Sequence, residues 1–331
     1  MKKYDVYGIG NALVDMEFQV EDSFYEENGI DKGLMTLVDE ERQNTLMNVI
    51  DQSKAKMKSG GSAANSIIAV SQFGGKGYYS CKVADDALGD FYLNDLKAAG
   101  VNSNLANGKR SSGITGKCLV MITPDAERTM NTFLGITADF SEQELDQQAL
   151  KDSKYLYIEG YLVASPTGFN AMMAAKKIAE DNGVKTALTF SDPNMITFFR
   201  ENMDSVVGAG LDLLFCNEEE AKTFTGKDNL FEAREELKKS ARTFAITLGK
   251  NGAIIYDGDT FIDIEPYNVQ ALDTNGAGDM FAGAFLYGLT HENSYAQSGK
   301  IASLASSKIV SQYGPRLEWH QAKEILNHVF E

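Results

Sequence analysis

Short apolar runs and amphipathic segments alternate along most of the chain. From about residue 141 the alternation is regular, because each apolar run of strand length is followed by a segment whose apolar positions recur with helical period. Strands that alternate with helices build a parallel sheet with helices on both faces. The pattern therefore predicts an α/β fold. The predicted strands here are 154–160, 185–190, 211–216 and 242–249, the predicted helices are 141–151, 166–182, 195–207, 217–225, 230–240, 277–290 and 294–312, and 252–264 is predicted to be a hairpin.

The first 140 residues mix this pattern with strict alternation of apolar and polar positions. The α/β pattern continues in strands 4–10 and 78–83 and in helices 39–51 and 90–100. Alternation at 16–20 and 34–38, separated by a polar turn, and in a hairpin over 113–133 indicates a half-exposed sheet. We expect one domain over 1–331, interrupted by a small sheet formed by roughly 12–38 and 110–137. Such a sheet would have one uncovered face and could act as a lid over a ligand.

The charge balance restricts the partners that the chain can have. The formal net charge is −16, which opposes binding to nucleic acid because a polyanion must be met by clustered Lys and Arg. No apolar run approaches the roughly 20 residues of a membrane-spanning helix. We therefore expect a small-molecule ligand, no nucleic-acid partner and no membrane partner. An anionic ligand would have to be held locally, by backbone N–H groups, a metal or a few cations.

Cysteine and histidine are scarce, which narrows the possible chemistry. The three cysteines are far apart, which argues against disulfides and a cysteine metal site, and no secretory signal is evident at the N-terminus. We expect a cytoplasmic protein. The three histidines all lie in the last 41 residues. Acid–base chemistry is therefore expected from a carboxylate.

The segment 273-DTNGAGDMFAGAF-285 combines glycines, two acids and an apolar helix. Glycines before a helix allow successive N–H groups to point outward, which makes an anion site at Gly276, Ala277 and Gly278. Asp279 stands in the first helical turn, where an acid can simply favour the helix start. Gly283 and Gly288 indicate close packing of the helix, which would hold the turn rigidly. A rigid anion site beside an acid indicates a general base next to a phosphate.

At this point the chain resembles the ribokinase-like (PfkB) carbohydrate and nucleoside kinases. The segment 273–279 resembles their C-terminal signature, and 60-GGSAANSIIAVSQFGG-75 resembles their N-terminal one. Within the family the chain is most similar to the adenosine kinase branch, on the segments 8-GIGNALVD-15, 157-YIEGYLVASP-166 and 212-DLLFCNEEEA-221. The resemblance implies a three-layer α/β/α domain with a mostly parallel central sheet and a β-sheet lid. It also implies Asp279 as the catalytic base and Gly276 to Gly278 as the anion hole.

The resemblance assigns further residues position by position. It implies contacts with the sugar hydroxyls for Asn11, Asp15, Gly60, Gly61 and Asn65, and with the nucleotide for Asn217, Thr247, Gly249 and Arg128. Glu220 would organise Mg²⁺ through water, and Asp273 would support a monovalent cation such as K⁺, with help from 309–315. Met35 and Leu37, with Tyr161 or Leu162, could pack against a base.

Each assignment has a simpler structural interpretation. Asn65 could be a helix cap, Asp15 a loop acid, and 60–61 a turn. Glu218 and Glu219 are expected to lie at the surface, and Glu220 could belong to the same solvated helix face. Thr247 and Gly249 could be only a strand and a turn, and Arg128 a surface residue.

The expected activity is ATP-dependent phosphorylation of a primary, 5′-type hydroxyl of a purine nucleoside, with adenosine first. A sugar or sugar-acid kinase (ribose, fructose, 2-keto-3-deoxygluconate) is the alternative, because 192-DPN-194 is more similar to the sugar kinases and the strand end 160–166 is less aromatic than in adenosine kinases. A non-catalytic binding protein is a remote alternative. The sequence argues against a dinucleotide-dependent oxidoreductase, because Leu13 stands where a G-x-G-x-x-G motif requires its third glycine. A monomer and a lid-mediated homodimer are both compatible with the sequence.

Overall fold

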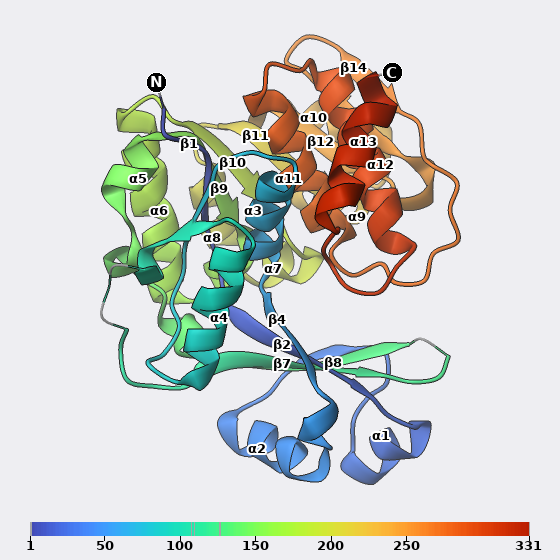
Figure 1. Cartoon of the computed structure of the whole chain (residues 1–331). Coiled ribbons are helices and arrows are strands. Elements are labelled where there is room, and N and C mark those ends of the chain that lie inside the picture. The colour runs from blue at the N-terminus through green and yellow to red at the C-terminus, as the bar shows by residue number, and fades with distance from the viewer. Residues whose placement is uncertain (1, 107, 109, 126, 331) are drawn as a thin grey trace.

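A nine-stranded sheet runs through the larger part of the molecule. The computed structural model describes residues 2–106, 108, 110–125 and 127–330, and Figure 1 shows their arrangement. The strand order is β14-β13-β12-β11-β10-β9-β1-β5-β6, parallel except for the hairpin β13–β14. The strands are β1 (Tyr4–Ile9), β5 (Gly77–Ser80), β6 (Asn102–Ser103), β9 (Ser153–Glu159), β10 (Lys185–Thr189), β11 (Leu211–Asn217), β12 (Ala241–Thr247), β13 (Ala253–Tyr256) and β14 (Phe261–Ile264).

Helices bury both faces of this sheet, as the alternation of strands and helices predicted. Along β9, Tyr155 and Tyr157 enter one hydrophobic cluster and Leu156 and Ile158 the other, since successive side chains point to opposite faces. The first cluster is supplied by α3 (Ser62–Gln72), α4 (Ala87–Ala98), α11 (Ala277–Thr290), α12 (Tyr295–Val310) and α13 (Trp319–Phe330). The second is supplied by α5 (Gln147–Lys151), α6 (Pro166–Asp181), α7 (Pro193–Phe198), α8 (Arg200–Val207), α9 (Glu218–Thr225) and α10 (Leu230–Leu237). The predicted three-layer α/β/α fold is confirmed.

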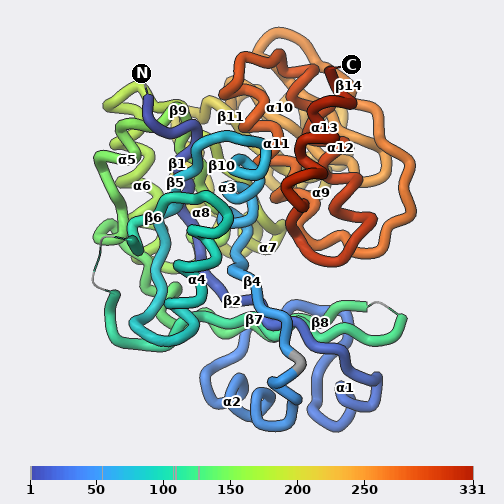
Figure 2. Tube along the Cα trace, viewed as in Figure 1, coloured from blue at the N-terminus to red at the C-terminus, as the bar shows by residue number. Residues whose placement is uncertain are grey.

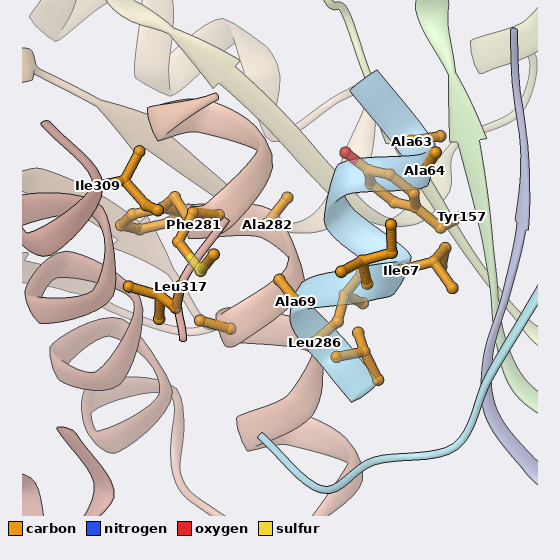
Figure 3. Packing of buried hydrophobic residues seen from close by; sticks show 14 of the residues in the cluster. Ala63, Ala64, Ile67, Ala69, Tyr157, Phe281, Ala282, Leu286, Ile309 and Leu317 are labelled. Carbon is orange, nitrogen blue, oxygen red and sulfur yellow. The ribbon is translucent and has the colours of Figure 1, made fainter. Parts of the chain in front are cut away.

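Helices α3 and α11 pack together closely because glycine removes the side chain at the contact. A Cβ on Gly283 would lie 2.3 Å from the carbonyl oxygen of Ser66, and one on Gly288 would lie 2.5 Å from Oγ of Ser298 on α12. Figure 3 shows Ala282 and Leu286 of α11 on the side of Ala69 and Ile67 of α3, whereas Phe281 lies beside Ile309. The close packing fixes the start of α11 relative to the start of α3.

A second, five-stranded sheet lies at one end of the large one, with the order β3-β8-β7-β2-β4. On β2, Val14, Met16 and Phe18 are buried, whereas the alternate positions face the other way. The helices α1 (Asp22–Asn28) and α2 (Glu40–Val49) lie against this sheet (Figure 2) and cover its buried face, where Tyr25 and Leu46 join the same cluster. The strands are β2 (Leu13–Gln19), β3 (Met35–Leu37), β4 (Lys56–Gly60), β7 (Thr115–Ile122) and β8 (Arg128–Gly135).

Several elements differ from the prediction. The segment expected to be a polar turn forms the helix α1, which begins at Asp22 and ends before the left-handed Gly29. The edge strand β4 and the terminal α13 were not predicted, since β4 has the mostly polar sequence KMKSG. Helix 195–207 is divided into α7 and α8 at Phe199. No helix in the described residues has both the length and the apolar character needed to cross a membrane.

Candidate active site

A cavity of about 500 Å³ lies between the carboxyl ends of the large sheet's strands and the inner face of the second sheet. Residues of β2, β3, β7 and β8 line the cavity on one side, and the starts of α3, α9 and α11 line it on the other. The predicted site residues that line it are Asn11, Asp15, Met35, Leu37, Gly61, Asn65, Tyr161, Asn217, Glu220, Thr247, Gly276, Gly278 and Asp279. The structure thus brings together residues that are far apart in the sequence.

Asp279 is held by neutral donors from the first turn of α3. Oγ of Ser62 donates to Oδ1 at 2.6 Å, and Nδ2 of Asn65 donates to Oδ2 at 3.0 Å. Burial raises the pKa of the Asp279 carboxyl to about 6, and these two hydrogen bonds oppose the rise because they favour the ionised form. The carboxylate is therefore oriented without a cationic partner and remains basic enough to accept a proton near neutral pH.

The start of α11 provides backbone N–H groups beside this acid. Gly276, the residue before the helix, has φ 76°, and a Cβ there would lie 2.3 Å from Cβ of Pro315, so glycine is required. The first intrahelical bond runs from Met280 N–H to the Gly276 carbonyl, which leaves the N–H groups of Gly278 and Asp279 without an intrahelical acceptor. Ala277 N–H donates to Thr274 at 3.3 Å. This end of the helix suits an anion.

Gly278 has no packing reason to be glycine. A Cβ at this position would meet no atom within 4 Å and would project into open space beside the cavity. By contrast, a Cβ on Gly60 would lie 2.3 Å from Oδ1 of Asp15, and a Cβ on Gly61 would lie 2.2 Å from the carbonyl oxygen of Asn11. Gly60 and Gly61 therefore make room for their neighbours, whereas glycine at position 278 leaves space open at the cavity.

Glu159 is a site residue that the sequence analysis missed. At the end of β9 it is 1% exposed, and Oε1 accepts hydrogen bonds from N–H and Nδ2 of Asn11, at 3.2 and 3.0 Å. Oε2 accepts from Ala63 N–H at 2.8 Å, in the same turn as Ser62. Burial raises the Glu159 pKa to about 7. One buried acid thus fixes both Asn11 and the turn that holds Asp279; an acid ending an otherwise apolar strand was the available sequence clue.

Asn217 and Glu220 form a reciprocal cap at the start of α9. Asn217 Oδ1 accepts from Glu220 N–H at 2.8 Å, and Glu220 Oε2 accepts from Asn217 N–H at 2.9 Å. Glu220 is 5% exposed, so it does not belong to a solvated face, and burial raises its pKa to about 7. The cap occupies one carboxylate oxygen. Oε1 of Glu220 makes no hydrogen bond with the described residues.

Five predicted residues, in addition to Gly60, lie outside the cavity lining. Ala277 lies between the lining residues Gly276 and Gly278, and Gly249 lies two residues after Thr247, which also lines the cavity. Arg128 and Asp273 form an ion pair, with Nη2 of Arg128 2.8 Å from Oδ2 of Asp273. The sequence analysis assigned these two residues to different ligands and did not foresee their contact. Leu162 is buried in the core, and its neighbour Tyr161 faces the cavity.

Comparisons with known proteins agree with this geometry. A model of the pfkB family carbohydrate kinases matches residues 30–322. Adenosine kinase from Saccharomyces cerevisiae is 26% identical over 93% of this chain and 95% of its own length. A probable sugar kinase from Rhizobium etli CFN 42 superposes with a TM-score of 0.89 at 32% identity over 99% of both chains. Adenosine kinase from Sinorhizobium meliloti superposes with a TM-score of 0.88 at 34% identity, over 97% of this chain and 99% of that one.

The relatives include kinases of nucleosides and of sugars, so the comparisons fix the class of reaction and not the acceptor. A cavity with a carboxylate base beside free helix N–H groups is the chemistry that phosphoryl transfer to a hydroxyl requires. The chain belongs to the pfkB family of carbohydrate kinases and is a phosphotransferase that acts on an alcohol group.

Proposed function

We propose that the protein transfers the γ-phosphoryl group of ATP to the primary 5′-hydroxyl of a purine nucleoside, with adenosine as the first choice. The observation that carries the proposal is that the two walls of the cavity differ in chemistry. Asp279 and the α11 N–H groups lie at one wall, and apolar side chains of the second sheet lie at the other. A nucleoside has a hydroxyl and a base at opposite ends, which matches this division.

The base end of the substrate is assigned to the second sheet. Met35 and Leu37 on β3 are 46% and 60% exposed, although both are large apolar residues in a strand that lines the cavity. Exposed apolar side chains that gather at a cavity indicate a ligand that buries them. A purine would cover them together with Tyr161, whereas a free sugar is too small and polar to do so.

The sugar end is assigned to the polar residues between the sheets. Oδ1 of Asn65 is buried without a hydrogen-bond partner in the described residues, while its Nδ2 holds Asp279. A ribose hydroxyl would satisfy this acceptor, since a buried unpaired polar atom is costly. Asp15 faces the same space, and its carboxylate can accept bonds from two neighbouring hydroxyls. Asn11 and Gly61 complete this part of the site.

The chemical step is assigned to Asp279 and the loop before it. Asp279 accepts the proton of the 5′-hydroxyl as its oxygen attacks the γ-phosphorus, and the bond from phosphorus to the β-phosphate oxygen breaks to release ADP. N–H groups of 276–279 stabilise the charge on the transferring group. Arg128 contributes positive charge at the other end of this loop, through its ion pair with Asp273.

The nucleotide is assigned to the strand ends beyond the loop, at Asn217, Thr247 and Gly249. Mg²⁺ fits near Glu220, because hard cations prefer oxygen ligands and keep waters that a free carboxylate oxygen can hold. When bound, Mg²⁺ would neutralise charge on the phosphates. We assign the second sheet as a lid over this cavity, formed by 12–38, 56–60 and 110–137, which would exclude water from the reaction.

A sugar or sugar-acid kinase is the second candidate, and one observation favours it. Asp192 lines the cavity near Tyr161, where its carboxylate could accept hydrogen bonds from sugar hydroxyls. Its Oδ1 also accepts from Asn194 N–H at 2.7 Å, so the residue already has a structural role at the start of α7. In this alternative, the ligand would leave the apolar side chains of Met35 and Leu37 without a contact.

A substrate panel tests the proposal. ADP release is measured with ATP, Mg²⁺ and adenosine, inosine, guanosine, ribose, fructose or 2-keto-3-deoxygluconate. We expect kcat/KM for adenosine to exceed that for every sugar by at least about 100-fold, because only a nucleoside fills both walls. Turnover of a sugar with none of any nucleoside would contradict the proposal and support the second candidate. A thermal shift with adenosine but no ADP release would indicate that the protein binds the nucleoside without acting on it.

A further inference from the structure

Asp273, the first acid of the loop, is held from three directions. Oδ1 accepts a hydrogen bond from Asn275 N–H at 3.0 Å, which closes the loop locally. Oδ2 accepts from Gly314 N–H at 3.0 Å and lies 2.8 Å from Nη2 of Arg128. The side chain of Asp273 is only 3% exposed. Both oxygens of this buried carboxylate therefore already have partners, and its charge is balanced by a cation from within the chain.

Arg128 reaches this position from β8 of the second sheet. Its side chain is 9% exposed, its Nη1 lies 3.5 Å from Oε1 of Glu17, and its guanidinium carbon lies 6.0 Å from the centre of the Tyr313 ring. None of its nitrogens makes an aligned hydrogen bond with the described residues. The interaction with Asp273 is thus one of charge. Arg128 acts as a buried counter-ion between the second sheet and the loop.

A monovalent cation beside Asp273, which the family resemblance implies, does not fit these surroundings. It would have to share Oδ2 with the guanidinium or approach Oδ1 beside the N–H of Asn275. In the first position it would stand next to another positive charge in a poorly solvated place, where like charges repel strongly. A carboxylate that is already neutralised also offers a cation little compensation for losing its water.

We propose that Arg128 takes the place of the monovalent cation, so that the loop 273–279 is organised by an internal guanidinium and the enzyme works without K⁺. The inference rests on the proposed function only for the loop's role in catalysis. Because the counter-ion belongs to β8, the loop is ordered when the second sheet is in position. Removing the side chain of Arg128 should leave Asp273 uncompensated and create a site at which an added cation binds.

The test measures thermal unfolding in KCl and in tetramethylammonium chloride at equal ionic strength, because melting does not depend on turnover. We expect the same melting temperature in both salts for the wild-type protein. Arg128→Ala should melt lower in tetramethylammonium, and about 100 mM K⁺ should raise its melting temperature by roughly 2 °C. Arg128→Lys keeps the charge and should remain indifferent to K⁺. Lys32→Ala, which removes an exposed cation paired with Asp22 and Asp125, is the matched control and should also show no difference between the salts.

Binding of thallium(I), observed by ²⁰⁵Tl nuclear magnetic resonance, gives a second readout on the wild-type protein. A K⁺-dependent melting temperature or specific Tl⁺ binding in the wild type would overturn the proposal, whether or not Arg128→Ala folds. Indifference of both the wild type and Arg128→Ala to K⁺ would overturn it as well, since the vacated position would then not be a cation site. Failure of the proposed kinase activity would leave each of these results intact.

Discussion

Asp273 and Asp279 stand at the two ends of one loop, yet their surroundings differ in kind. Asp279 faces the cavity and receives hydrogen bonds from the neutral donors Ser62 and Asn65. Asp273 points away from it, toward Arg128 and two backbone N–H groups. The carboxylate with neutral partners is available to a ligand in the cavity, whereas the carboxylate paired with a guanidinium is already engaged within the protein. Residue type alone therefore does not assign the base; the partners do.

Asp279→Asn should produce the largest effect on activity. The amide keeps the shape of the side chain but cannot accept a proton, so we expect kcat to fall by about 10³-fold. The variant should not lose stability. A carboxyl whose pKa is raised from its usual value to about 6 opposes folding above that pH, and a neutral amide removes this cost. The melting temperature at about pH 8 should therefore be equal to or higher than that of the wild type. A melting temperature well below the wild-type value would show that Asp279 is a structural residue.

Asp273→Asn should mainly affect stability. It removes the nearer of the two carboxylates beside the buried guanidinium of Arg128 and leaves only Glu17, 3.5 Å away, which costs about 3 kcal/mol of the free energy of unfolding. For a chain of this size the melting temperature should fall by roughly 5–10 °C. Asp204→Asn is the matched control, because Asp204 pairs with Arg200 in an exposed position where removal costs about 1 kcal/mol or less. Equal losses in the two variants would mean that the buried pair has no special role.

Most of the large sheet was predictable from the sequence, because parallel strands buried on both faces are continuous apolar runs. The second sheet was less predictable from the sequence. The strand β4 has no apolar alternation, and it pairs with β2 through backbone hydrogen bonds that residue patterns do not report. The helix α1 was not predicted, because it has too few apolar residues in the sequence to be distinguished from a turn.

In the active site, the sequence identified residues and the structure identified their partners. Asp279 could be found because it belongs to a short local pattern of glycines and acids. Ser62 and Glu159 could not be assigned, since their roles depend on contacts with residues far away along the chain. The pairing of Arg128 with Asp273 is of the same kind, and it changes what the first acid of the loop does.

The pH dependence of kcat/KM tests most directly the central claim that Asp279 is the base. The base must be ionised, so kcat/KM should fall as the pH drops through about 6, the raised pKa of Asp279. Asp15 and Glu159, both with pKa values raised to about 7 by burial, also titrate near this range, so a variant must identify the group. Ser62→Ala removes a hydrogen bond that lowers the pKa of Asp279 and should move the acid limb upward by roughly half a unit. Ser205→Ala, on the exposed face of α8, should leave it in place. An acid limb that is absent, or that stays at the same pH in Ser62→Ala, would contradict the account.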